Sequence, residues 1–230
     1  VFSFQFSVFS FQFSVFSLYK VPGPTLQTDA LVLLKQPPAD AFQSFTVFSA
    51  EHGVLLALQR IPKKNATATV ALDLFDDAAL FLESSNQGRT WFVRESRLLS
   101  RPAGIGRRYE SLRFASALTA LIARNPVPDE SRAPIAALLR AALAAFAKSA
   151  RPELIYFKSL YRFARDEGYP VKQEWLAGLP AADRTQAERL LATPLATLEE
   201  TPSAIANPQL ATLLRRLEEY LRTHTEILLG

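Results

Sequence analysis

Positively charged side chains are the residues whose types and spacing best suggest a chemistry in this chain. Between Arg89 and Arg113 the sequence places seven arginines against two acids, a local net charge of +5 in a chain whose net charge is +4. A second basic run, Arg60, Lys63 and Lys64, follows an apolar segment. Clustered cations of this kind are typical of a phosphate-binding surface. The alternative interpretation is an arginine-rich face that is merely solvated.

Residue types and motifs argue against catalysis and against a metal site. The chain contains no cysteine and two histidines, His52 and His224, which lie far apart in the sequence. This composition excludes disulfides, zinc–thiolate sites and thiol nucleophiles. The serine-hydrolase elbow, the phosphate loop and the zinc-protease motif are all missing from the sequence. We therefore predict that the protein is not an enzyme and uses no cofactor.

The segment 104–108, Gly-Ile-Gly-Arg-Arg, allows two interpretations. It precedes a predicted helix, so that helix N–H groups together with Arg107 and Arg108 would cradle a phosphate. The same two glycines are also typical of a linker between domains.

The elements that must position these cations begin with a β-rich half. Turn signals are found at Glu51-His52-Gly53 and at 84–88. Short apolar runs rich in β-branched and aromatic residues lie between such signals, at 29–34, 45–48, 54–58, 68–75, 78–83 and 89–93. Five or six short strands in succession favour a small closed barrel, and an OB-fold is the natural five-stranded candidate.

The second half of the chain is helical in pattern. Apolar residues at helical spacing predict helices over 109–123, 134–147, 152–167 and 184–191, and a last helix from Asn207. The core face of that last helix is Leu210, Leu213, Leu214, Leu217 and Leu221. The predicted fold class is α+β: an OB-fold-like β-barrel over 26–103, followed by an all-α helical domain over 104–230.

The first 17 residues repeat the unit VFSFQFS. The odd repeat length moves the phenylalanines from one face of a strand to the other, so no single half-buried strand can use the pattern. The chain also contains no methionine. These features indicate a fragment, or a start codon placed too far upstream. We expect residues 1–25 to be a low-complexity leader, disordered or misassigned, and assign them no function.

The order of these pieces resembles the RecO family of bacterial recombination mediators, over roughly residues 26–170. The matching pieces are the opening strand Thr28–Leu34, the hairpin Phe45–Gly53 and the helix end Tyr156–Pro170. Two features depart from the family pattern. With no cysteine the chain lacks the four-cysteine zinc element that many relatives carry, and Arg60-Ile61-Pro62 stands where the family has a glycine. The resemblance is therefore to a zinc-less variant.

The resemblance implies a cytoplasmic, nucleoid-associated DNA repair protein of the RecF pathway. Such proteins bind single- and double-stranded DNA, anneal complementary strands and help to load the recombinase. The partners implied are RecR and the C-terminal tail of single-stranded-DNA-binding protein, with no membrane. The DNA-binding residues that we predict are Arg60, Lys63, Lys64, Arg89, Arg94, Arg97, Arg107 and Arg108.

Aromatic residues near these cations allow base stacking or a place in the barrel core. The candidates are Phe48, Trp91 and Phe92. Contacts with about five phosphates would give a log–log salt slope of roughly −3.5 on single strands.

A different class of function remains open, that of a protein–protein adaptor without DNA binding. An acidic, apolar peptide would need a hydrophobic pocket bordered by cations. The segment 157–165 combines both, and its candidate residues are Phe157, Lys158, Tyr161, Arg162 and Arg165.

Overall fold

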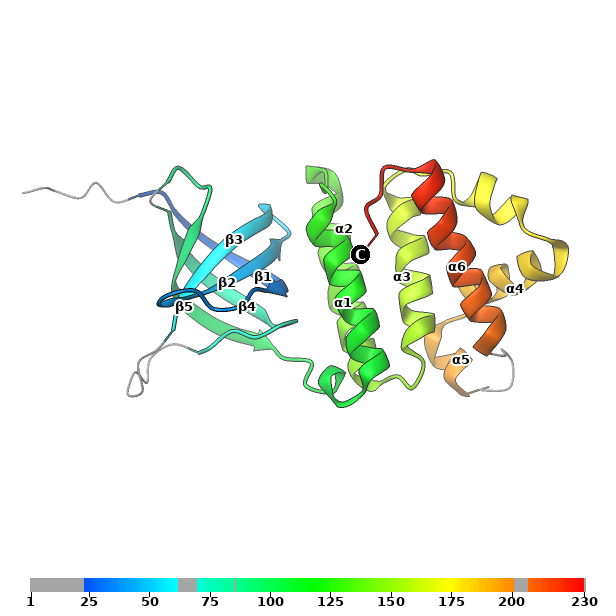
Figure 1. The fold of residues 1–230 in the computed structure, drawn as a ribbon, viewed down its shortest axis with the longest axis horizontal. Coiled ribbons are helices and arrows are strands. Elements are labelled where there is room, and N and C mark those ends of the chain that lie inside the picture. Colours follow the sequence, from blue (N-terminus) through cyan, green and yellow to red (C-terminus); the bar gives the residue numbers. More distant parts are fainter. Residues whose placement is uncertain (1–22, 62–69, 85, 201–206, 230) are drawn as a thin grey trace, which may run out of the picture.

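The computed structural model describes residues 23–61, 70–84, 86–200 and 207–229. A closed five-stranded sheet is followed by a helical region, so the predicted α+β class, with an N-terminal barrel-like sheet, is confirmed (Figure 1). The VFSFQFS leader and two of the predicted DNA-binding residues, Lys63 and Lys64, lie outside the described residues.

The barrel is formed by β1 (Thr25–Lys35), β2 (Phe42–Ser49), β3 (Gly53–Arg60), β4 (Asp77–Glu83) and β5 (Trp91–Ser100). The strand order is β1-β2-β3-β5-β4, and the sheet closes because β1 also pairs with β4. All neighbours are antiparallel except β3 and β5, which run parallel and share two residue pairs, Ala57–Trp91 and Leu58–Phe92. That seam brings the end of β3 beside the start of β5.

Local turn chemistry accounts for the two hairpins. Gly53 has φ +68° and Gly88 has φ +86°, a conformation that glycine adopts without a steric cost. Both predicted turns are confirmed. The strand predicted at 68–75 is wrong over its described part: residues 70–76 form an irregular segment with a turn. Phe75 has φ +70° there, and the Asp76 carboxylate accepts a hydrogen bond from the Asp73 amide at 2.7 Å.

The helical region contains η1 (Ile105–Arg107), α1 (Tyr109–Arg124), α2 (Asp129–Lys148), α3 (Pro152–Asp166), η2 (Lys172–Leu176), α4 (Ala181–Ala192), α5 (Leu195–Glu200) and α6 (Asn207–His224). Each of the five predicted helices is present. Helix α2 begins at Asp129, directly after Pro128, which is five residues before the predicted start at Pro134. The sequence patterns missed the π-helical turn η2 and the short helix α5.

Among the described residues, two hydrophobic clusters form the core, and one of them joins the barrel to the helices. The barrel interior is filled by residues such as Val32, Val47 and Leu82. The larger cluster combines Leu31 and Phe48 of the barrel with the buried faces of the helices. Figure 1 shows α1 and α2 between the barrel and α3. Phe48 is 1% exposed, so it belongs to this core and is not a stacking surface.

Polar contacts and close packing also fix the barrel to the helices. Arg140 of α2 donates to both carboxylate oxygens of Asp77 on β4, at 2.8 and 3.3 Å. Arg132 of α2 donates to the Glu51 carbonyl oxygen at 3.1 Å, in the turn before β3. Gly104 packs so closely on α2 that an added Cβ atom would overlap the Ala147 carbonyl oxygen. The segment 104–108 is therefore packed against α2 and is not an extended linker.

Candidate nucleic-acid groove and peptide cleft

A small groove lies where β2, β3, β4 and β5 meet, and it combines aromatic, apolar and charged side chains. Its volume is about 280 Å³, and its lining residues are Phe42, Leu58, Arg60, Glu83, Phe92, Val93 and Arg94. Strand register brings them together. Phe42 on β2 pairs with Arg60 on β3, and Phe92 on β5 lies between Leu58 on β3 and Glu83 on β4. We call this site the barrel groove.

The aromatic part of the barrel groove is an edge-to-face pair. The rings of Phe42 and Phe92 have centroids 5.6 Å apart and an interplanar angle of 68°. Both side chains are half-buried, so part of each ring remains open to solvent. Partly exposed aromatic rings beside cations are the surfaces on which single-stranded bases stack.

The charged part of the barrel groove consists of two arginines and one carboxylate. Arg94 Nε lies 2.6 Å from Glu83 Oε2, in an ion pair whose arginine is half exposed. Arg60 is exposed at the end of β3 and has no ion-pair partner among the described residues. The groove therefore carries a net positive charge, with one cation open and the other already paired.

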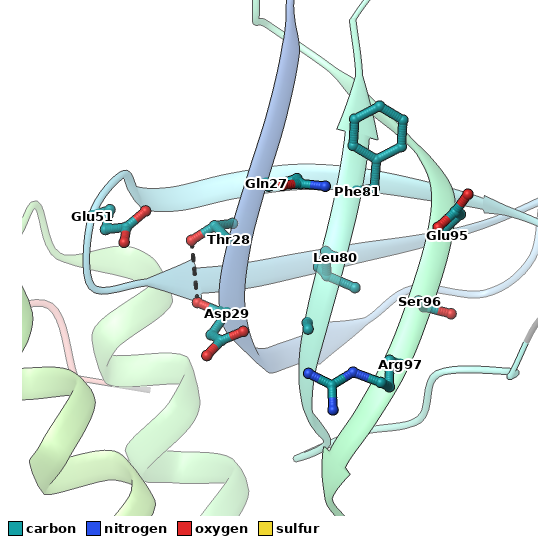
Figure 2. Close-up of a pocket in the computed structure, with 10 residues that line it drawn as sticks. Gln27, Thr28, Asp29, Glu51, Leu80, Phe81, Glu95, Ser96 and Arg97 are labelled. Carbon is teal, nitrogen blue, oxygen red and sulfur yellow. Dashed lines mark hydrogen bonds between the residues drawn. The ribbon is translucent and has the colours of Figure 1, made fainter.

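The other predicted cations that the structure describes do not line the barrel groove. Arg97 lies in a separate cleft of about 560 Å³ on the face formed by β1, β4 and β5. Figure 2 shows it in that cleft with Asp29, Glu51 and Glu95, three carboxylates that disfavour a phosphate. Arg89 is exposed in the turn between β4 and β5.

The two arginines near α1 have separate surroundings. Arg107 is exposed on η1, whereas Arg108 is half-buried and donates to the Phe146 carbonyl oxygen of α2 at 3.4 Å. Arg108 thus helps to hold the helical region together, and within the segment 104–108 both Gly104 and Arg108 contact α2. Of the predicted cations, the structure brings together Arg60 and Arg94.

Sequence reasoning missed Phe42 and Glu83 as members of the site. Phe42 could have been predicted from the hairpin register, because counting outward from the Gly53 turn places it opposite Arg60. Glu83 required the β4–β5 pairing, in which the register shifts at a bulge near Leu82. Trp91, also considered for stacking, packs against the barrel interior.

A second cleft lies between α2 and α3 and contains four of the five residues predicted to bind a peptide. Its volume is about 430 Å³, and its walls are mostly apolar, with Leu138, Ala141 and Ile155 among them. The predicted residues that line it are Lys158, Tyr161, Arg162 and Arg165. Phe157 does not, because it is fully buried and packs on Trp175 with ring centroids 6.1 Å apart.

The three cations of this peptide cleft have different roles. Lys158 Nζ donates to the carbonyl oxygens of Leu190 and Thr193, both at 2.7 Å, and so caps the end of α4. Burial lowers the pKa of the Lys158 ammonium group. Arg162 and Arg165 are exposed and share the carboxylate of Asp166, at 3.2 and 2.6 Å. These two arginines are therefore the cations that an acidic ligand would reach.

Comparisons with protein-family models and with curated proteins find no match for this chain. Over the part of the chain that the structure describes, no helix has the length and apolar character needed to cross a membrane. Within the same residues, no three side chains of histidine, aspartate or glutamate gather into a group that would hold a metal ion.

Proposed function

We propose that the barrel groove binds single-stranded DNA and that the protein acts as a non-catalytic recombination mediator, which anneals strands and helps to load a recombinase. The observation that carries the DNA-binding part is the combination of Phe42 and Phe92 with Arg60 and Arg94 on one small surface. The β2–β3 face of an OB-fold is also where such barrels bind oligonucleotides. The mediator role rests on the resemblance described above.

The groove explains how bases and phosphates would be held together. A base that stacks on the open face of Phe92 or Phe42 contributes about 1–3 kcal/mol and does so without regard to sequence. Arg60 then binds the adjacent phosphate. Arg94 binds a second phosphate only when its ion pair with Glu83 breaks. Two phosphate contacts correspond to a log–log salt slope of about −1.4 on single strands.

The test is a salt titration with matched arginine variants. Fluorescence anisotropy of a labelled single-stranded oligonucleotide is measured for the full chain, R60A/R94A and the control R97A, whose arginine lies in the acidic cleft. We expect R60A/R94A to weaken binding and to flatten the salt slope by about 1.4, with R97A unchanged. An unaltered slope in R60A/R94A, or no binding by the full chain at low salt, would overturn the proposal. A strand-annealing assay on the same variants tests the mediator role.

The peptide cleft favours a second candidate function, a protein–protein adaptor that binds an acidic, apolar peptide such as the tail of single-stranded-DNA-binding protein. Its apolar walls between α2 and α3 would receive apolar side chains, and Arg162 and Arg165 would meet the acids. Calorimetric titration with a short acidic peptide that ends in an apolar residue tests it. We expect R162A/R165A to abolish the heat of binding, and K172A, on an exposed residue of η2, to leave it intact. Equal binding by both variants would rule out this cleft.

A further inference from the structure

An exposed apolar strip continues from the barrel groove along β3. Leu58 lines the groove, and Leu56 and Val54 lie on the same outward face of the strand, because side chains alternate between the two faces. Ala57 and Gln59 mark the opposite, interior face and are buried. Leu56 is 42% exposed and Val54 is 40% exposed. The groove and this apolar strip therefore form one surface, which Leu58 joins.

The neighbouring strand borders the apolar strip with hydroxyl groups. In the register of β2 and β3, Ser44 pairs with Leu58, and Thr46 pairs with Leu56. Both hydroxyl residues are half-buried, and they face outward because Phe45 between them fills the barrel interior. A serine or threonine hydroxyl can donate to the polar edge of a base or accept from it. The surface thus offers apolar contact on β3 beside polar contact on β2.

The apolar strip has a definite length and a charge at one end alone. It ends at Val54, whose partner in the register is Phe48, a residue of the core shared with the helices. From Arg60 to Val54 the strand advances about 20 Å. About six nucleotides of a stacked single strand span this length, at about 3.4 Å each. The two groove arginines, Arg60 and Arg94, lie at the end opposite Val54.

We propose that a single strand of DNA held in the barrel groove continues along the apolar strip, and that the strip makes the site select unpaired strands. This extension rests on the proposed function of the groove. Continuity through Leu58 makes the strand in the groove the occupant of the strip. An unpaired base can turn its face onto Leu56 and Val54, as bases do on protein surfaces that bind single strands. A duplex presents base edges and phosphates instead.

Matched variants of exposed apolar residues test the extension in the full chain. V54S/L56S removes the strip. L99S/L112S is the control, because its leucines are 41% and 38% exposed and do not line the groove. With a labelled oligonucleotide of about twelve nucleotides, we expect V54S/L56S to weaken binding about tenfold and to leave the salt slope unchanged, since no charge is lost. The control should bind as the full chain does. Unaltered affinity in V54S/L56S would overturn the extension.

Oligonucleotide length and base pairing give a second readout. The affinity of the full chain should rise with length up to about six nucleotides. In V54S/L56S the rise should stop at about two or three, the length that two phosphate contacts hold. A duplex should bind V54S/L56S and the full chain equally. Equal weakening for duplex and single strand would show that the strip does not select unpaired strands.

R60A/R94A separates failure of the extension from failure of the proposed function. If R60A/R94A flattens the salt slope while V54S/L56S binds normally, the groove binds the strand and the extension is wrong. No binding by the full chain overturns both. Sedimentation of the free protein examines another occupant of the strip. A dimer that V54S/L56S converts into a monomer would show that a second copy covers the strip, and this result would also overturn the extension.

Discussion

At the residue scale, both proposed anion-binding surfaces hold arginines that a neighbouring carboxylate already engages. Arg94 is paired with Glu83, and Arg162 and Arg165 share Asp166. Because the arginines of these pairs are about half exposed to solvent, each pair contributes little to stability, about 1 kcal/mol or less. Their main effect is to hold the arginines in place. An incoming anion must therefore displace a carboxylate before it can bind one of them.

The first prediction concerns that exchange in the barrel groove. E83Q should tighten oligonucleotide binding several-fold at low salt, because Arg94 loses its charged competitor and the groove gains one net positive charge. E95Q changes the charge of the whole protein equally but lies in the acidic cleft, so it is the control. Anisotropy titrations of both variants measure the difference, and equal effects would mean that net charge alone governs binding.

A second prediction follows from the partly buried carboxyl of Glu167. Burial raises the pKa of this group above its ordinary value near 4.5, and one carboxylate oxygen is buried without a hydrogen-bond partner. The folded state therefore binds a proton more readily than the unfolded state, and the charged form costs stability once the pH rises above the folded pKa. E167Q should be more stable than the natural chain at pH 7 and about equal to it near pH 4.

Denaturant titrations at the two pH values check the prediction for Glu167. E219Q, on an exposed residue of α6, is the control and should be neutral at both. A gain in E167Q that is the same at both pH values would show that ionisation is not its cause.

At the element scale, the close approach of η1 to α2 depends on a missing side chain. Gly104 has an ordinary φ of −72°, so its role is space and not backbone conformation. An added Cβ atom would meet backbone atoms of Ala147, which cannot rotate away. G104A should cost about 1–3 kcal/mol in free energy of unfolding. G106A meets no atom within 4 Å and should be neutral. Thermal unfolding of both variants measures this, and equal losses would contradict it.

Most helices and strands could be predicted from the sequence, because their signals are local patterns along the chain. Alternation and turn glycines set the hairpin around Gly53, and helical spacing of leucines gave the buried face of α6, where Leu210, Leu217 and Leu221 are all fully buried. The segment 70–76 was wrongly predicted as part of a strand, because Leu72 and Phe75 are buried without belonging to a strand. They are buried from a turn that the Asp76 carboxylate stabilises, and this carboxylate in turn pairs with Arg101 at 2.5 Å.

The residues that line the candidate sites could be predicted only in part, because the sites depend on pairings between segments that are distant in the sequence. Four of the five residues predicted to bind a peptide line one cleft, because they lie on one helix, α3. Of the predicted DNA-binding residues that the structure describes, two line the barrel groove. Arg60 and Arg94 meet through the parallel seam of β3 and β5, whereas Arg97, three residues further along the same strand, lies in another cleft. Charge clustering along the sequence does not reveal which face of a barrel each cation occupies.

At the scale of the whole molecule, the barrel and the helices are expected to unfold as one unit. They share the larger hydrophobic cluster, and the ion pair between Asp77 and Arg140 joins them. A barrel released from the helices would expose Leu31 and Phe48, which are 2% and 1% exposed in the intact chain. Such apolar exposure would be costly, so neither part should remain folded when the other unfolds.

The two tryptophans make this last prediction measurable, because Trp91 lies in the barrel and Trp175 in the helical region. W175F leaves the barrel as the sole source of tryptophan fluorescence, and W91F leaves the helices. Each background is compared with and without D77N, which weakens the pair with Arg140 by roughly 1 kcal/mol. We expect D77N to lower the unfolding midpoint equally for both reporters. A shift confined to one reporter would show two independent domains, in which case the helices could not hold the barrel groove in a fixed shape.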